Sequence, residues 1–151
     1  MRALPNRQSI RLQSHDYSAP GAYFVTICTW RRRRLLSKIV DSRVELSPLG
    51  RAVERCWLAI PQYFEGAAID EFVIMPDHLH GIIHLAGPRG RPAPLSGVVR
   101  RFKLSVTQWA REHLALERIW HRNYYERIVR DPRALVAIRR YIEQNPAKWR
   151  G

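Results

Sequence analysis

The chain has 151 residues, which fits one domain at about 100–200 residues per domain. Its 26 Lys and Arg residues against 13 Asp and Glu give a formal net charge of +13, and 46% of its residues are hydrophobic. This composition excludes wholesale disorder, and no apolar run reaches the ~20 residues of a membrane span. Two cysteines are too few for a disulfide framework. The N-terminus lacks the apolar stretch of a signal peptide, so we expect a cytoplasmic protein without a membrane partner.

Arginine dominates the positive charge, because only Lys38, Lys103 and Lys148 of the 26 basic residues are lysines. The planar guanidinium matches phosphate oxygens and stacks on bases. GC-rich codon usage would explain the ratio of arginine to lysine, but it would not explain the excess of positive charge. The composition therefore favours a nucleic-acid partner.

The first half of the chain is predicted to form a strand, a helix and two further strands. Residues 1–20 are polar and irregular. Ser47 followed by Pro48 is typical of a capped helix start, and apolar residues recur after it at helical spacing. Strand character comes from β-branched and aromatic residues. The predicted elements are a strand at Ala22–Trp30, a helix from Pro48 to about Ile60, and strands at Ala68–Met75 and Leu79–Leu85.

The second half is predicted to form a helix, a strand and a last helix. A loop rich in Gly, Pro and Arg spans Gly87–Pro94, and the last helix follows an Asp131 cap and ends near Gln144, before Asn145 and Pro146. The other two elements are a helix at Ser96–Leu114 and a strand within Ile119–Val129. This order predicts a single α+β domain: a ferredoxin-like β-α-β-β-α-β unit with an antiparallel four-stranded sheet, plus a C-terminal helix.

A histidine pair opens one of the predicted strands. His78 and His80 are two residues apart, so both imidazoles should leave the same face of the strand while Leu79 faces the other way. Imidazole is a common ligand of divalent metals, although a pair of surface histidines has the same pattern. Histidine-triad hydrolases need a third histidine where this chain has Ile82. For His84 we expect a solvated or packing role.

Tyr141 and Asn145 lie four residues apart on the predicted last helix, so they should share one face of it. A tyrosine hydroxyl can act as a covalent nucleophile, and an asparagine oxygen can complete a metal shell. The residues alone leave a purely structural interpretation open. In that interpretation Tyr141 is an aromatic residue at the edge of the core, and Asn145 is a helix-terminal residue before proline.

Four segments together carry a family resemblance. They are SIRLQSHDYSAPGAYFVTICTW, EFVIMPDHLHGIIHL, VVRRFKLSVT and IWHRNYYERIVRDPRALVAIRRYIEQNPAKW, and they cover nearly the whole chain. In this order and spacing the sequence resembles the REP-associated tyrosine transposases and the single-tyrosine insertion-sequence transposases of the HUH nuclease superfamily. The resemblance implies cleavage and transfer of single-stranded DNA next to hairpins, through a 5′-phosphotyrosine intermediate.

The resemblance also implies roles for particular residues. His78, His80 and Asn145 would hold Mg²⁺ or Mn²⁺, and Tyr141 would be the nucleophile. Tyr124 and Tyr125 compete for that role but rank lower, because the family's tyrosine sits on the final helix. Relatives act as dimers, so we expect a homodimer, and the sequence leaves open which subunit supplies the tyrosine. Asp77 stands where relatives commonly have Asn, and it would either add a carboxylate near the metal or cap the turn.

Basic residues near these segments are candidate phosphate contacts, although any one of them could be an ordinary solvated side chain. They are Arg31, Arg32, Arg33, Arg34, Arg100, Arg101, Lys103, Arg122, Arg127 and Arg130. Two alternatives remain at this point. One is a catalytically idle protein that binds DNA hairpins, and the other is an RNA-binding module.

Overall fold

A computed structural model describes residues 21–86 and 94–151. The predicted polar segment 1–20 and residues 87–93 of the predicted loop lie outside them. The described elements, in chain order, are β1 (Gly21–Cys28), the 3-10 turn η1 (Trp30–Arg32), β2 (Ser37–Val40), β3 (Arg43–Leu46), α1 (Pro48–Leu58), α2 (Ile60–Tyr63), β4 (Ala67–Met75), β5 (His78–Leu85), α3 (Leu95–Leu114), β6 (Tyr125–Val129) and α4 (Pro132–Lys148).

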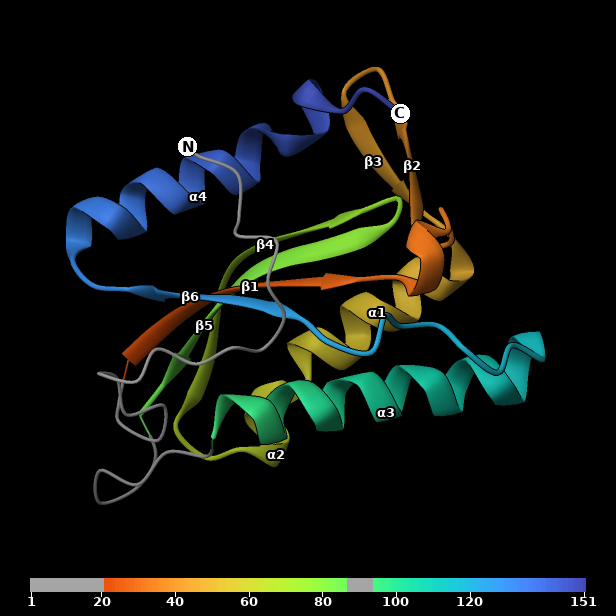
Figure 1. Ribbon diagram of the computed structural model, residues 1–151, viewed down its shortest axis with the longest axis horizontal. Coiled ribbons are helices and arrows are strands. Elements are labelled where there is room, and N and C mark those ends of the chain that lie inside the picture. The colour runs from red at the N-terminus through yellow and green to blue at the C-terminus, as the bar shows by residue number, and fades with distance from the viewer. Residues whose placement is uncertain (1–20, 87–93) are drawn as a thin grey trace.

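The main sheet has the strand order β4-β5-β1-β6, and every neighbouring pair in it is antiparallel. Helices α1 and α3 lie against one face of this sheet, and α4 crosses the other face (Figure 1). The predicted α+β, ferredoxin-like fold with an additional C-terminal helix is therefore confirmed. No helix within residues 21–86 and 94–151 is long and apolar enough to cross a membrane.

Both predicted helix caps are present. The Ser47 hydroxyl accepts a hydrogen bond from the Gly50 N–H at 2.9 Å, and the Asp131 carboxylate accepts one from the Ala134 N–H at 2.8 Å. Each bond satisfies one of the amide groups that a helix start leaves without an intrahelical partner. Helices α1 and α4 therefore begin where the sequence predicted.

A short hairpin between β1 and α1 was not predicted. Strands β2 and β3 are joined by Asp41 and Ser42, both in the left-handed region with φ values of 52° and 62°. Two left-handed residues make a turn whose twist matches that of the flanking strands. The usual sequence signal for such a turn is a glycine, and this turn has none.

The predicted end of the last helix was wrong, because α4 continues through Pro146 to Lys148. Proline removes one backbone donor, but here the loss falls in the last turn, where intrahelical bonding is ending. The Asn145 amide also donates a hydrogen bond to the Tyr141 carbonyl at 2.7 Å. The predicted end of the first strand at Trp30 was also wrong, because β1 stops at Cys28 and Thr29 forms only an isolated bridge with Trp120. The short strand predicted within Ile119–Val129 is present as β6, Tyr125–Val129.

The large hydrophobic core lies between the sheet and the helices α1 and α3. Trp57 is fully buried at its centre, with its ring centroid 5.1 Å from that of Phe102. Gly81 of β5 makes room for it, because a Cβ built at this glycine would lie 2.6 Å from Trp57 Cζ2. The other face has a much smaller cluster of buried residues, formed by Phe24, Ile82, Ile138 and Ile142.

Candidate active site

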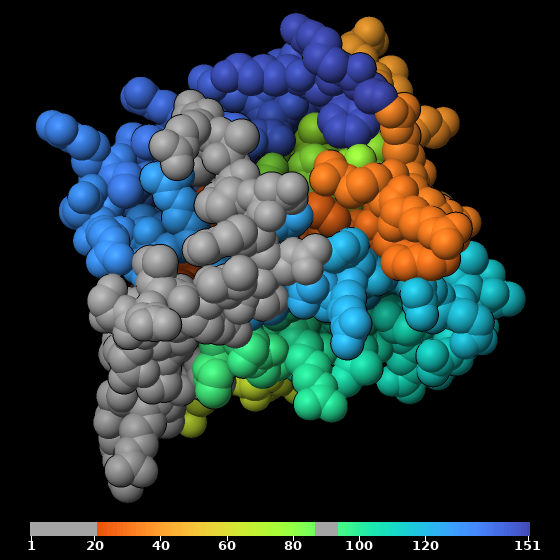
Figure 2. Space-filling view, in the orientation of Figure 1, coloured from red at the N-terminus to blue at the C-terminus, as the bar shows by residue number. Residues whose placement is uncertain are grey.

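The histidine pair lies at the start of β5, on the face covered by α4. The ring centroids of His78 and His80 are 4.5 Å apart, and the two residues are only 7% and 5% exposed. Leu79 points the other way and is fully buried in the large core. In Figure 2, atoms of the β4–β5 hairpin (green) show between the C-terminal part of α4 (dark blue) and the orange segment that follows β1. This end of the sheet therefore reaches the surface.

Each imidazole has a partner at its Nδ1 atom. His80 Nδ1 lies 2.8 Å from the Thr26 hydroxyl, and His78 Nδ1 lies 2.7 Å from Asp77 Oδ1. A carboxylate can only accept, so the His78 Nδ1–H donates to Asp77. A hydroxyl can accept as well as donate, so the Thr26 hydroxyl can hold the His80 proton on Nδ1 in the same way, which would make both Nε2 lone pairs available to a ligand. This is how metal-binding histidines are commonly oriented by their neighbours.

Asp77 is itself held by Arg32. The guanidinium donates from Nε to Asp77 Oδ2 at 3.1 Å and from a terminal nitrogen to Oδ1 at 3.3 Å. Burial opposes ionisation of this carboxyl, but the hydrogen bonds from His78 and Arg32 outweigh it and lower the pKa of Asp77 to about 2. Arg31 and Arg32 adopt left-handed backbone conformations, with φ values of 57° and 52°. This unusual turn brings the Arg32 side chain back to Asp77.

Burial keeps His80 in its neutral form. It holds the pKa of the His80 imidazole well below its usual range, and electrostatic interactions with His78 and Arg32 lower this pKa further. A neutral imidazole retains the lone pair that metal ligation needs.

The helix α4 brings Tyr141 and Trp149 over the two histidines. The Tyr141 ring lies edge-on to His80, with 5.5 Å between their centroids, and the Trp149 ring lies 6.5 Å from that of His78. Asn145 is one helical turn from each of these residues, so it lies on the same face of α4. Its amide nitrogen donates to the Tyr141 carbonyl, which leaves its side-chain oxygen as an acceptor.

The two competing tyrosines lie elsewhere. Tyr124 is 6% exposed and belongs to the large core on the other face of the sheet. Tyr125 pairs with Thr26, which in turn pairs with His80, so its side chain lies on the face covered by α4. It is nevertheless two strands away from His80, about 10 Å at the usual strand spacing. The Tyr141 ring is in contact with the ring of His80.

Comparisons with known proteins agree with this geometry. The family model described as "Transposase IS200 like" matches residues 21–145. The chain belongs to the IS200-like transposase family. A protein of Haemophilus influenzae whose function is uncharacterised is 39% identical over 162 aligned positions, which cover 95% of this chain and 90% of that protein.

Two solved structures share the fold of this transposase. A REP-associated tyrosine transposase bound to a REP hairpin superposes with a TM-score of 0.69 at 21% identity, over 92% of this chain and 74% of that one. A candidate transposase from Deinococcus radiodurans superposes with a TM-score of 0.54 at 17% identity, over 89% of this chain and 97% of that one. The predicted resemblance to tyrosine transposases is thus confirmed.

Seven of the predicted phosphate contacts lie after β1 or in and beside β6, and one of them, Arg32, is linked to His78 through Asp77. Arg31 to Arg34 follow β1 directly and are all exposed, and the Arg34 guanidinium lies 5.4 Å from the Trp149 ring centroid. Arg127 is exposed on β6, where it pairs with Phe24 and so shares the face of α4. Arg122 and Arg130 are exposed in the segments flanking β6.

The remaining three predicted contacts are on α3, on the opposite face of the sheet. Arg100 and Arg101 are exposed, and the Arg101 guanidinium stacks over the Tyr63 ring at 4.0 Å. Lys103 donates to the carbonyls of His121, Arg122 and Asn123 at 2.8–3.4 Å. Burial lowers the pKa of Lys103 to about 8. Its ammonium therefore fixes the loop before β6, and Arg100 and Arg101 lie on the face of the sheet opposite the histidine pair.

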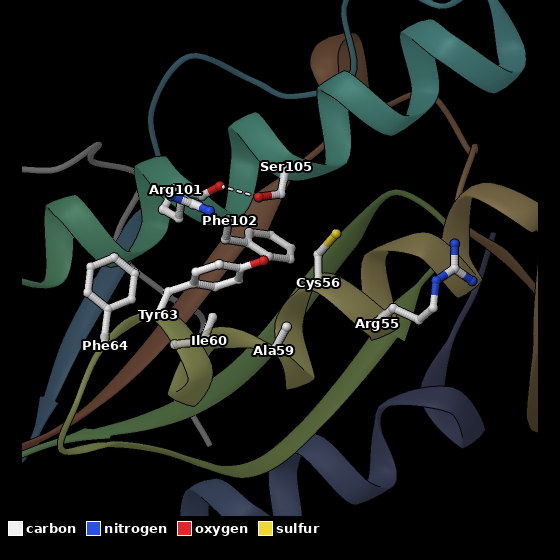
Figure 3. Close-up of a pocket in the computed structure, with 9 residues that line it drawn as sticks. All are labelled: Arg55, Cys56, Ala59, Ile60, Tyr63, Phe64, Arg101, Phe102 and Ser105. Carbon is white, nitrogen blue, oxygen red and sulfur yellow. Dashed lines mark hydrogen bonds between the residues drawn. The ribbon is translucent and has the colours of Figure 1, made fainter.

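A pocket of about 200 Å³ opens beside Arg101, between α1, α2 and α3 (Figure 3). Its walls are mainly apolar, with Ile60, Phe64 and Phe102 among them, and Arg55 lies at its edge. It is on the face of the large core, so it contributes nothing to the site at His78 and His80.

Sequence reasoning missed three features around the site. Thr26 orients His80, but recognising this requires the β1–β5 register. Trp149 lies beyond the predicted end of the last helix, so its place over His78 could not be foreseen. Asp70 accepts hydrogen bonds from both His84 and Arg139, whereas His84 was expected to be solvated or simply packed. The charged pair Asp70 and Glu71 inside an otherwise apolar strand was the available signal.

Proposed function

We propose that this transposase is a metal-dependent single-strand DNA endonuclease and strand transferase that uses Tyr141 as its nucleophile. The observation that carries the proposal is the Tyr141 ring beside a pair of convergent imidazoles whose Nδ1 atoms are both engaged. Its membership of the IS200-like family supports transposition as the overall reaction.

The residues present fit a divalent metal. Two imidazole nitrogens from His78 and His80 and the side-chain oxygen of Asn145 make a mixed nitrogen and oxygen set. The part of the chain that the structure describes contains no group of three His, Cys, Asp or Glu side chains that could hold a metal, and we propose the uncharged Asn145 as the third protein ligand. Mg²⁺ or Mn²⁺ bound there would act as a Lewis acid on the scissile phosphate.

The chain's own residues would perform the covalent step. The Tyr141 oxygen attacks phosphorus and loses its proton to solvent, while the bond from phosphorus to the 3′ oxygen breaks and that oxygen takes up a proton. The products are a phosphotyrosine on the 5′ side and a free 3′-OH. Because the number of phosphoester bonds is unchanged, a second 3′-OH can attack the phosphotyrosine, release Tyr141 and join two strands without an external energy source.

The DNA partner is proposed to be single-stranded DNA that carries hairpins. The structurally similar REP-associated transposase is bound to a REP hairpin. In this chain, exposed arginines follow β1 at the edge of the proposed site, and Trp149 offers an aromatic ring next to His78. Arginine suits phosphate contacts, and an aromatic ring can stack on an unpaired base. A homodimer remains a prediction from the resemblance.

The deciding experiment is a denaturing gel with hairpin-bearing single-stranded DNA from the regions flanking the gene, with and without Mn²⁺ or Mg²⁺. DNA labelled at its 3′ end should migrate slowly as a protein adduct, and DNA labelled at its 5′ end should yield a shorter fragment. Tyr141→Phe should abolish both products while leaving hairpin binding intact. Tyr63→Phe, at an exposed tyrosine on the opposite face, is the matched control and should behave as the wild type.

Other outcomes would change the proposal in distinct ways. An adduct that persists in Tyr141→Phe would show that another residue is the nucleophile. Tight, salt-sensitive binding with no adduct under any metal would favour an idle hairpin-binding protein. Tighter binding of the equivalent RNA hairpins would favour an RNA-binding module.

A further inference from the structure

The helix that carries Tyr141 is fixed to the sheet by few buried residues. Only Ile138 and Ile142 are buried among the 17 residues of α4, and they pack against Phe24 and Ile82. Helix α3, on the other face, buries six of its 20 residues. Leu135 and Tyr141 of α4 pack against the same cluster but are only partly buried. Apolar contacts are non-directional, so this small cluster constrains the rotation of α4 about its own axis less than a directional bond does.

One polar contact supplies that direction. The Arg139 guanidinium donates from Nε to Asp70 Oδ1 at 2.9 Å and from a terminal nitrogen to Asp70 Oδ2 at 2.6 Å. Within residues 21–86 and 94–151, this is the only side-chain hydrogen-bonded link between α4 and the sheet. A two-pronged contact between planar groups constrains orientation as well as distance. Arg139 also lies only two positions before Tyr141.

A β-bulge in β4 and two further hydrogen bonds orient the Asp70 carboxylate. The β4–β5 register shifts between Ile69 and Phe72, so that Asp70 and Glu71 together lie opposite the single residue Ile82. Such a bulge redirects side chains and is common beside active sites. His84 Nε2 lies 2.7 Å from Asp70 Oδ2, and the Glu71 N–H donates to Asp70 Oδ1. Contacts within the sheet therefore orient the carboxylate independently of α4.

The angular positions of Arg139 and Tyr141 around the α4 axis link the Asp70 contact to the orientation of Tyr141. Successive residues of an α-helix are about 100° apart around its axis. With Ile138 and Ile142 facing the sheet, Arg139 falls on one flank of the buried stripe and Tyr141 on the other. Arg139 reaches Asp70 on the edge strand β4, whereas Tyr141 faces His80 on the inner strand β5. A rotation that released Arg139 would therefore also turn Tyr141 relative to the histidines.

We propose that the Asp70–Arg139 pair, supported by His84, is a positioning device that sets the rotation of α4 and so places the Tyr141 hydroxyl for attack. This inference rests on the proposed function, because it assumes that Tyr141 is the nucleophile. Asp70 and Arg139 act through the helix and need not touch the DNA. Misplacing a nucleophile by about 1 Å can reduce a rate by about a hundredfold.

The first test measures single-turnover adduct formation at saturating hairpin DNA. Asp70→Asn and Arg139→Ala should each reduce the rate constant by about 10- to 100-fold. The double variant should be no slower than the slower single variant, because both remove the same contact. Arg139→Lys keeps the positive charge but loses the two-pronged geometry, and it should recover only part of the rate.

Two controls separate positioning from other roles. The two single variants change the net charge in opposite directions, so a direct DNA contact by Arg139 would affect only the arginine variants. Partial unfolding would reduce the final amount of adduct and leave the rate constant unchanged, whereas misplacement reduces the rate constant and leaves the amount unchanged. Three outcomes would overturn the proposal. The single variants could form the adduct at the wild-type rate, the double variant could show the product of the two single effects, or the variants could lose only the final amount of adduct with no change in the rate constant.

A second test does not depend on activity. The Tyr141 ring lies edge-on to both Phe24 and His80, with centroid distances of 6.1 and 5.5 Å, so its ring protons should show displaced NMR shifts. These resonances are assigned by their absence in Tyr141→Phe. In Asp70→Asn they should move toward the values of an unstructured chain, while those of Phe102 stay in place. Unchanged Tyr141 shifts would overturn the positioning proposal, even if wild-type protein formed no adduct.

Discussion

The two faces of the four-stranded sheet differ in what covers them. Among residues 21–86 and 94–151, one continuous cluster of 22 buried residues lies under α1 and α3, whereas the cluster under α4 has four. The α4 face instead carries the histidine pair, with Thr26 and Asp77 at their Nδ1 atoms, and the ion pair of Asp70 with Arg139. One face of the sheet therefore stabilises the fold, and the other holds polar side chains in defined orientations.

This division has a physical reason. Buried polar groups are costly unless they are hydrogen-bonded, so a site with several of them leaves little room for apolar packing. The large core on the opposite face supplies the free energy that the α4 face gives up. Residues on the two faces should then respond differently to substitution, in stability on one side and in site chemistry on the other.

The largest expected effect on stability comes from Phe102→Ala. Phe102 is 1% exposed and its ring contacts those of Trp57 and Trp120, so its loss should lower the free energy of unfolding by about 3–5 kcal/mol. Urea denaturation measures this change. Leu104→Ala, at a 57% exposed position on the same helix, should change it by less than about 0.5 kcal/mol. A loss below about 1 kcal/mol in Phe102→Ala would contradict the assignment of the main core to this face.

A smaller effect, dependent on pH, is expected from Asp77→Asn. Removing the carboxylate weakens its hydrogen bonds with His78 and Arg32 and should destabilise the fold by about 1–3 kcal/mol at pH 7. The folded pKa of Asp77 is about 2, below the value of about 3.9 of a free side chain. Its contribution is therefore complete above about pH 4 and is lost as the pH falls through 2.

Denaturation at a series of pH values tests this prediction. The stability difference between wild type and Asp77→Asn should narrow from pH 4 to pH 2. Asp41→Asn removes the same charge at an exposed turn position, where asparagine is readily accepted, and should have little effect at any pH. A difference that stayed constant down to pH 2 would argue against an ionised, hydrogen-bonded Asp77.

The smallest effect on stability is expected from Thr26→Val, which leaves His80 Nδ1 without its partner. The free energy of unfolding should fall by about 1 kcal/mol, but affinity for Mn²⁺ should fall by 10- to 100-fold, as is typical when an outer partner of a metal ligand is lost. Titration calorimetry of the folded protein measures the affinity. Thr107→Val, at a half-buried position on α3, should leave it unchanged. Equal Mn²⁺ affinity in the two variants would remove Thr26 from the site.

Local patterns in the sequence predicted much of the fold. Caps at Ser47 and Asp131, the alternation that separates His78 and His80 from Leu79, and the order of the six ferredoxin-like elements all depend on near neighbours in the chain. What escaped prediction depends on distant contacts or on unusual local chemistry. Thr26 acquires its role only through strand register, and the β2–β3 turn adopts left-handed conformations without glycine.

The last helix illustrates both causes of failed prediction, the distant contacts and the unusual local chemistry. Proline at 146 predicts a helix end, but the structure tolerates it in the final turn, and this extension carries Trp149 to His78. The bulge at Asp70 has no sequence signature apart from a charged residue inside a strand. A sequence pattern could therefore indicate the chemistry of the site, but it could not show how the tyrosine helix is oriented.

The two left-handed arginines after β1 bear on how this protein would respond to selection in the laboratory. A left-handed conformation costs a non-glycine residue about 1–2 kcal/mol, and glycine adopts it freely. Glycine at position 31, where φ is 57°, should therefore raise heat resistance. At position 32, where φ is 52°, glycine would relieve the same strain but would lose the two hydrogen bonds that the Arg32 side chain donates to Asp77. Selection for heat resistance should therefore change position 31 first, whereas position 32 should keep its arginine because of its contact beside the histidine pair.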